Sequence, residues 1–397
     1  MRAAVLTGPL VCAFVVTVGF VAVPCAALQS RNFSDLAGLI TAFRRGDAVN
    51  ALAEFTTWDA TRVAREYEAW DSQRIAGQRF LPAGTDTPDT ATLVLLHTLA
   101  AMQSGEFRAS SLARGGTSHY QSALRLMKTL VPAQHLSRTD PARGKWATDP
   151  ELHRFCRDWY TIATALWLSA RQCFQAARTA QEGLTRLGTE ADLLLAAGSV
   201  AESQMGPFED GTQLEPSCAE AWGPSQFTRR GLLLIHTRSR ETAQDFLERA
   251  VLFDSSLAEA HLRLGRVYFW ADRQADAQRE LERAVTSMNE AEHAFVGYLA
   301  ALFLGQLHEE AHRIDEARTA YEQAITFNRG GSAAHIALGH LLLRSGADEE
   351  GWARVRAALD SPHQNGLAEI DPWVDYRNGQ SWLTLRRVEA LAAWVQR

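Results

Sequence analysis

The feature that most constrains this chain is a repeated spacing of small residues in its second half. Gly231, Gly265, Gly305 and Gly339 each lie in a short apolar stretch, at separations of 34, 40 and 34 residues. Two further positions after each glycine tend to carry alanine, with a bulky residue between them. The first alanine position holds Ala243, Ala277 and Ala317, and the bulky position holds Leu247, Leu281 and Tyr321. The second alanine position holds Ala250, Ala284, Ala324 and Ala358. Small residues let two antiparallel helices approach closely, and the large residue fills the remaining space.

This spacing predicts helix pairs that stack on one another. No single pair can bury its apolar face alone, so neighbouring pairs must form a solenoid. Residues 28–397 contain no run of strict apolar alternation, and apolar residues recur instead at three- and four-residue spacing. That periodicity is typical of amphipathic helices. The sequence therefore predicts an all-α fold.

The repeat resembles the tetratricopeptide repeat (TPR) family, whose period is 34 residues. The resemblance covers residues 224–359 and is weaker over 150–204, where Gly198 could open a degenerate unit. The chain lacks the family's early tryptophan and terminal proline, and Gly351 and Trp352 alter the last unit. The resemblance implies a right-handed solenoid of antiparallel helix pairs that binds other proteins.

In TPR proteins the first helix of each pair lines a concave groove that binds a peptide, which implies the same role for the matching positions here. Those positions are Thr228, Leu232, His236, Leu262, Arg266, Phe269, Trp270, Leu302, Gln306, Glu309, Glu310, Ile336, His340 and Arg344. The set is neither basic nor uniformly apolar. Arg266, Phe269 and Trp270 suit an interface hot spot, since Trp and Arg are enriched there. The alternative is that Trp270 only caps the end of its helix.

The first residues have the composition of a secretory signal peptide. Residues 3–23 carry no charge, Arg2 precedes them, and the small residues Cys25, Ala26 and Ala27 follow. A basic start, an apolar stretch and a small-residue exit predict export, with cleavage after Ala26 or Ala27. Two alternatives stay open. One is a retained membrane anchor, because about 20 apolar residues can span a bilayer, and the other is lipid attachment at Cys25.

The sequence predicts five segments along the chain. The predicted divisions are a signal peptide (1–27), an N-terminal helical region (28–148), degenerate helical repeats (149–223), TPR-like repeats (224–359) and a C-terminal capping segment (360–397). The loop Gly206–Gly223 interrupts the degenerate repeats and is either a plain insertion or a binding loop. Residues 370–376 are predicted to be irregular, and residues 382–396 to form a helix that caps the solenoid.

One local pattern suggests chemistry. His308–His312 reads His-Glu-Glu-Ala-His, the H-E-x-x-H pattern in which two histidines on one helix face bind Zn²⁺ and the glutamate activates water. The repeat register puts His312 at the turn, so the helix is expected to end between the two histidines. A zinc-dependent hydrolase using His308, Glu309 and His312 is therefore only the alternative to a binding role. The sequence predicts no cofactor and no resident metal.

Charge and cysteine content narrow the function further. The net charge of −6 gives no basic surface for nucleic acid, and 46% hydrophobic residues exclude a disordered chain. Cys156 and Cys173 are expected on neighbouring helices at different heights, too far apart to pair. Buried free thiols are favoured over a bond between either of them and Cys218.

The sequence as a whole predicts a non-enzymatic scaffold exported to the bacterial envelope, periplasmic or extracellular. Its partner is a protein or peptide of unknown identity, with no nucleic acid. Membrane contact is expected only if the N-terminal segment is retained, and a membrane-anchored assembly factor is the corresponding alternative.

Overall fold

The structure is a computed structural model that describes part of the chain. The described residues are 33, 35–58, 87–103, 119–130, 149–170, 172–203, 229–360 and 371–377, with single residues or pairs within 62–69, at 106 and 205, and within 387–393. The predicted signal peptide and the loop Gly206–Gly223 lie outside them. In this part of the chain all regular structure is helical, as the sequence predicts. None of its helices has both the length and the apolar character needed to cross a membrane.

Backbone contacts divide the chain into two compact units. The first comprises residues 1–163, 185–187 and 383–397, and the second comprises residues 164–184 and 188–382. Helices of the first unit are α2 (Leu36–Arg44), α3 (Ala48–Thr57), α5 (Thr87–Gln103), α6 (His119–Leu130) and α8 (Pro150–Ser169) up to residue 163. Helices α2 and α3 pack together, as do α5 and α6. Trp159 is fully buried and donates a hydrogen bond to Thr98 at 2.8 Å, which joins α8 to α5.

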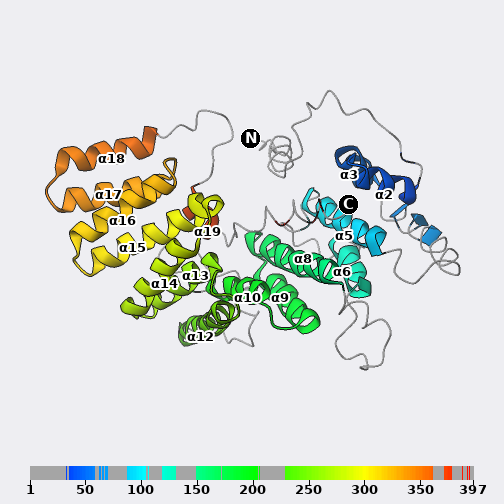
Figure 1. Ribbon diagram of the computed structural model, residues 1–397, viewed down its shortest axis with the longest axis horizontal. Coiled ribbons are helices and arrows are strands. Elements are labelled where there is room, and N and C mark those ends of the chain that lie inside the picture. The colour runs from blue at the N-terminus through cyan, green and yellow to red at the C-terminus, as the bar shows by residue number, and fades with distance from the viewer. Residues whose placement is uncertain are drawn as a thin grey trace. The chain divides into compact units, whose positions relative to one another are not determined.

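The second unit consists mainly of four antiparallel helix pairs (Figure 1). The pairs are α10 (Ala191–Glu202) with α12 (Arg229–Phe253), α13 (Ala258–Trp270) with α14 (Gln274–Ser287), α15 (Tyr298–Glu310) with α16 (Ile314–Phe327), and α17 (Ser332–Arg344) with α18 (Asp348–Asp360). Most of α9 (Cys173–Leu187) and all of α19 (Pro372–Arg377) also belong to this unit. The predicted TPR-like architecture is confirmed for these pairs.

The repeated glycines allow the two helices of a pair to touch. A Cβ built on Gly265 would lie 2.7 Å from Cγ of Leu281, and one on Gly305 would overlap the ring of Tyr321. A Cβ on Gly339 would likewise lie 2.8 Å from Val355. Any larger residue at these positions would force the helices apart, which confirms the packing that the spacing predicts.

A left-handed residue ends the first helix in three of the pairs. Asp272, His312 and Gly346 have φ values of 58°, 57° and 83°. In each case the next amide bonds to the carbonyl five residues earlier, at 2.9 Å. This is the Schellman arrangement, which satisfies free carbonyls at the helix end and reverses the chain within a few residues.

The predicted first repeat is wrong in one respect. Gly231 does not open a short first helix, because α12 runs without interruption from Arg229 to Phe253. The first helix of this pair is instead α10, where a Cβ on Gly198 would lie 2.7 Å from Leu247. The physical reason is the absence of a turn signal: Arg238 stands where the other pairs have Asp272, His312 or Gly346, and nothing there favours a left-handed residue.

The C-terminal segment also differs from expectation. Residues 370–376 were predicted to be irregular, but Pro372–Arg377 forms the helix α19. The cap predicted over residues 382–396 lies almost entirely outside the described residues and stays a prediction. Helix α19 starts where it does because Pro372 occupies its first position and Asp371 precedes it.

The cysteines give a mixed result. Cys156 is free and buried, and burial raises the pKa of its thiol. Cys173 is disulfide-bonded, which corrects the expectation of a free thiol there, and its partner lies outside the described residues. The expectation that these two cysteines do not pair with each other agrees with the free state of Cys156.

Candidate binding surface on the first helices

The first helices of successive pairs form one continuous surface. Helix α10 contacts α13, α13 contacts α15, and α15 contacts α17. We call the side of these four helices that faces α19 the inner surface. Helix α19 contacts α15 and lies beside α13 (Figure 1). The chain therefore places one of its own segments on the surface that the TPR resemblance predicts to bind a peptide.

An arginine enclosed by aromatic rings lies at the centre of this contact. The Arg266 guanidinium lies 4.6 Å from the ring centroid of Trp270, 5.0 Å from Phe303, 5.0 Å from Trp373 and 4.7 Å from Tyr376. Cations are attracted to aromatic faces at such distances, more strongly when water is excluded, and Arg266 is only 8% exposed. Half of these rings come from the inner surface and half from α19.

Buried charges flank this cluster. Arg263 donates to Glu202 at 2.7 Å and to Glu259 at 2.8 Å, and all three side chains are almost fully buried. The hydroxyl of Tyr376 donates a hydrogen bond to Glu202, and the Arg263 guanidinium lies 4.8 Å from the Tyr376 ring. Burial, followed by the nearby Glu202 carboxylate, raises the pKa of Tyr376. The phenol is therefore held in its neutral, hydrogen-bond-donating form.

A second anchor holds the start of α19. The carboxylate of Asp371 accepts hydrogen bonds from the Tyr298 hydroxyl at 3.2 Å, the Ser332 hydroxyl at 3.0 Å and the Ala333 amide at 2.8 Å. Ser332 and Ala333 begin α17, whose preceding residue, Gly331, offers no side-chain cap. Asp371 therefore supplies the acceptor that the first turn of α17 lacks, and the positive end of the helix dipole favours its charge.

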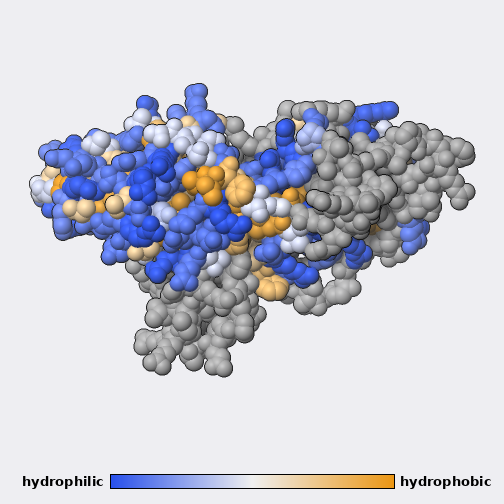
Figure 2. Space-filling view, turned by 60° about the horizontal axis from the view of Figure 1, so that its bottom comes forward, coloured by the Kyte–Doolittle hydropathy of each residue, from blue (hydrophilic) through white to orange (hydrophobic). Residues whose placement is uncertain are grey.

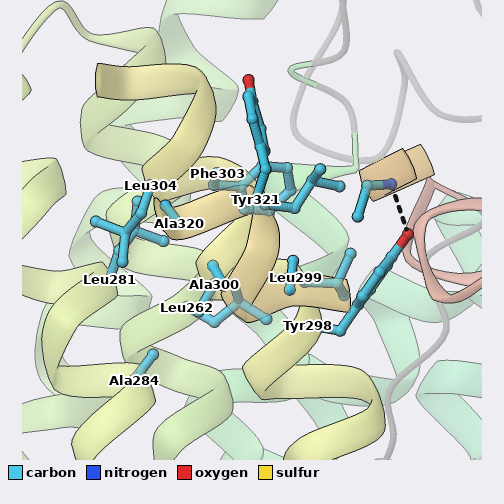
Figure 3. Close-up of a cluster of buried hydrophobic side chains, with 14 of the residues drawn as sticks. Leu262, Leu281, Ala284, Tyr298, Leu299, Ala300, Phe303, Leu304, Ala320 and Tyr321 are labelled. Atoms are coloured by element: carbon cyan, nitrogen blue, oxygen red, sulfur yellow. Dashed lines mark hydrogen bonds between the residues drawn. The ribbon is translucent and has the colours of Figure 1, made fainter. Parts of the chain in front are cut away.

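Tyr298 positions this anchor. Its ring packs against the backbone of Gly331, where an added Cβ would lie 2.6 Å from the phenol oxygen, so only glycine lets the phenol reach Asp371. The same hydroxyl accepts from the Ala334 amide at 3.2 Å, the bond drawn in Figure 3. Burial, and then the neighbouring carboxylate, raises the pKa of Tyr298. Both ends of α19 are thus held by bonds between a neutral phenol and a carboxylate.

The predicted groove residues fall into four groups. Thr228 lies outside the described residues, and Leu232 and His236 lie on the second helix α12, so they do not extend the row of first helices. Leu262 and Leu302 are buried in the core and face helices rather than a ligand. Arg266, Phe269 and Trp270 are covered or half-buried. Gln306, Glu309, Glu310, Ile336, His340 and Arg344 lie further along, exposed except for the half-buried Glu309.

These last residues form a part of the inner surface that α19 leaves uncovered. Ile336 is 50% exposed and follows the same helix face of α17 as His340 and Arg344. Glu309 accepts from the Tyr321 hydroxyl at 3.0 Å and from Arg344 at 3.2 Å, and His340 lies 3.4 Å from it. On the face shown in Figure 2, most of the described surface is hydrophilic, with hydrophobic side chains gathered in limited patches.

The H-E-x-x-H pattern does not form a zinc-protease helix. Helix α15 ends at Glu310, and His312 has a left-handed backbone in the following turn, as the repeat register predicts. His308 instead accepts a hydrogen bond from Arg313 at 3.1 Å, and burial, with Arg313 next, lowers its pKa. Glu309 is bound to Tyr321 and Arg344. The residues of the motif therefore serve the turn and the contact between repeats.

A histidine pair in the first unit was not predicted. His97 and His119 approach with their Nδ1 atoms 3.0 Å apart, and burial, reinforced by His119, lowers the pKa of His97 to about 3. The backbone amides of His119 and Tyr120 donate to the Glu106 carboxylate at 2.9 and 3.0 Å. Glu106 therefore caps α6, and the neutral imidazoles join α6 to α5. Among the described residues no cluster of three or more His, Cys, Asp or Glu side chains could hold a metal ion.

Of the residues that hold α19, the sequence singled out Arg266 but not its buried neighbours or the carboxylate anchor. Arg263, Glu202 and Tyr298 stand at positions that the repeat pattern treats as ordinary helix residues. The signal for α19 itself was present, because Asp371 and Pro372 are a helix-start pair. Nothing in the local pattern, however, indicated that Tyr376 lies against a residue 174 positions earlier in the chain.

Comparisons with known proteins find distant structural matches. No family model matches the chain, and no curated protein matches it. A crystal structure of MamA is 21% identical with a TM-score of 0.33, over 47% of this chain and 86% of MamA. PilF of Pseudomonas aeruginosa is 16% identical with a TM-score of 0.41, over 53% of this chain and 79% of PilF. Both are TPR proteins. At such TM-scores the TPR-type fold rests on the helix pairs, turns and glycine contacts described above.

Proposed function

We propose that this protein is a scaffold that binds a segment of a partner protein along its inner surface. One observation carries the proposal: a helix of six residues, α19, already lies on this surface through aromatic, arginine and carboxylate contacts. A surface that holds such a segment has the shape and chemistry to hold a peptide. No reaction is assigned to the protein.

The uncovered part of the inner surface extends the proposed binding site. It combines the apolar side chain of Ile336 with the charges of Glu309 and Arg344. Interfaces commonly surround an aromatic and arginine centre with a polar rim. A partner segment longer than α19 would therefore contact α17 as well.

We also propose that the protein is exported. The uncharged run of residues 3–23 supports this, and so does the disulfide at Cys173, because disulfides persist in oxidising compartments outside the cytosol. N-terminal sequencing of the protein from an envelope fraction tests the proposal. A chain that begins at Ala27 or Leu28 supports cleavage, whereas an intact N-terminus that resists alkaline extraction supports the membrane anchor.

Site-specific crosslinking tests the binding role. A photoreactive residue at Gln306, exposed on the inner surface, is expected to capture a partner segment in cells. The matched control is the same residue at Thr286, which is exposed on the second helix α14. Equal adducts at both positions, or none at Gln306, would contradict the proposal.

A further inference from the structure

We propose that the inner surface recognises acidic, aromatic segments of partner proteins, and that Asp371–Tyr376 is their internal stand-in. In this segment an aspartate is followed by proline and by two aromatic residues three positions apart, Trp373 and Tyr376. The inference rests on the proposed function, because it names the kind of segment that the scaffold binds. Two anchors on the inner surface define that kind.

The first anchor is specific for a carboxylate. Asp371 receives three donors from the inner surface, namely two hydroxyls and a backbone amide at the start of α17. The donors are held in place before any ligand arrives, since Tyr298 packs against Gly331 and the Ala333 amide belongs to a helix of thirteen residues. An amide or an apolar group would lose the charge that the helix dipole favours here.

The second anchor is specific for aromatic rings. The Arg266 guanidinium lies within 5.0 Å of four ring centroids, those of Trp270 and Phe303 on the inner surface and the two aromatic rings of α19. Phe303 meets Trp373 edge-on at 5.6 Å and Tyr376 at 5.7 Å. A ligand must bring flat rings to complete this enclosure, because an aliphatic side chain has no π face to offer the guanidinium.

The segment is suited to exchange rather than to permanent packing. A helix of six residues has almost no stability of its own in water, so α19 is held only by its contacts. The charges beneath it remain paired when it leaves, since Arg263 keeps Glu202 and Glu259. The segment also carries its own start signal, with the Trp373 amide donating to Asp371 at 2.9 Å. A partner with the same short motif can therefore take its place.

The internal segment sets the threshold for any partner. A ligand on the same chain competes intramolecularly, at an effective concentration that can reach about millimolar. Partners with the same motif would therefore bind the intact chain much more weakly than a chain whose own segment has been disabled. Contacts to the uncovered part of the inner surface, around Ile336, would let a true partner compensate for this difference.

A labelled peptide tests the inference. The probe is a fluorescent peptide with the sequence of residues 368–379, and the control peptide is identical except for Trp373→Ala and Tyr376→Ala. Both are titrated against the full chain and against the full chain carrying the same two substitutions, which vacates the site. The probe is expected to bind the vacated chain at least about tenfold more tightly than the wild type. Adding Arg266→Glu to the vacated chain is expected to abolish this binding.

The inference would be overturned if the vacated chain folds but binds the probe no more tightly than it binds the control peptide. If the vacated chain does not fold, the wild type still decides the question. The probe peptide then carries a photoreactive group in place of Trp373 and is added in excess to the wild-type chain. It is expected to label α13 and α15, and labelling elsewhere or nowhere would overturn the inference.

The outcome is separable from that of the proposed function. Partner adducts at Gln306 without probe binding would leave the scaffold role intact and reject the acidic, aromatic class of ligand. Probe binding without any cellular adduct at Gln306 would instead reject the scaffold role while the recognition chemistry stands.

Discussion

The inner surface has a covered half and an open half, although the same repeat builds both. Arg266 and His340 each follow a repeat glycine directly, and Trp270 and Arg344 each come five residues after it. Arg266 in α13 is covered by α19 and only 8% exposed, whereas His340 and Arg344 in α17 are both exposed. The repeat therefore fixes where a side chain points, and residues outside the repeat decide whether anything covers it.

The ion pairs of the two halves also differ in their exposure to solvent. Arg263 and Glu202 are almost fully removed from water in the covered half, so each depends on its partner. Glu309 and Arg344 in the open half lie near solvent, which screens their interaction. Four predictions test this difference, from the largest expected effect to the smallest.

The largest effect is expected from removing the buried arginine. Arg263→Met leaves Glu202 and Glu259 buried without their counter-charge, which should lower the free energy of unfolding by about 3–5 kcal/mol. Arg344→Met, the matched change in the open half, should cost less than about 0.5 kcal/mol. Hydrogen exchange of the α10 and α13 amides in both variants measures the contrast. Similar losses in the two variants would mean that the halves do not differ in this way.

Alkaline pH should weaken the covered half. Since the pKa values of Tyr298 and Tyr376 are raised in the folded chain, stability is complete below the ordinary phenol pKa. It falls as the pH rises above about 10, where the unfolded chain releases these protons. Each phenol should cost up to about 1.4 kcal/mol for each further pH unit. Urea unfolding at a series of alkaline pH values tests this, and Tyr376→Phe should flatten the dependence. An unchanged slope in that variant would assign the effect elsewhere.

At neutral pH the same substitution tests one hydrogen bond. Tyr376→Phe keeps the ring over Arg266 but removes the donor to Glu202, which should cost about 1–2 kcal/mol. Trp373→Phe is the control, because it keeps an aromatic ring beside Phe303. Thermal unfolding followed by circular dichroism compares the two. A larger loss for the control would show that ring size matters more than the buried hydroxyl.

The smallest effect is expected in the open half. Glu309→Gln removes the charge that faces Arg344 and His340 but keeps an acceptor for the Tyr321 hydroxyl. The basic side chains of both pairs are exposed, so the substitution should lower the free energy of unfolding by about 0–1 kcal/mol. This loss should depend only weakly on salt concentration. Urea unfolding at low and high salt measures it. A loss as large as that of Arg263→Met would erase the distinction between the halves.

Local patterns predicted most of the fold. The glycines at 265, 305 and 339 identified three of the four helix pairs, because close helix contact needs a small residue at a fixed spacing. The same pattern failed at Gly231, where the spacing was correct but the turn residue was missing. Spacing alone does not define a helix pair unless a left-handed turn can form between the two halves.

The candidate site was predicted only in outline. Arg266 and Trp270 were singled out from their place in the repeat, and they do lie against each other. Leu262 and Leu302 were also assigned to the groove but belong to the core. Helical periodicity marks a face, but it does not say how far the neighbouring helix covers that face.

The sequence by itself determined the helices, their pairing in three repeats and the turn that His312 occupies, since these depend on residues close together in the chain. Only the tertiary structure decided that α19 returns to the inner surface. Its anchors are Glu202, Arg266, Phe303 and the start of α17, which lie between 38 and 174 residues away. Contacts over such separations leave no periodic trace in the sequence, because they depend on where the stacked helices carry the chain.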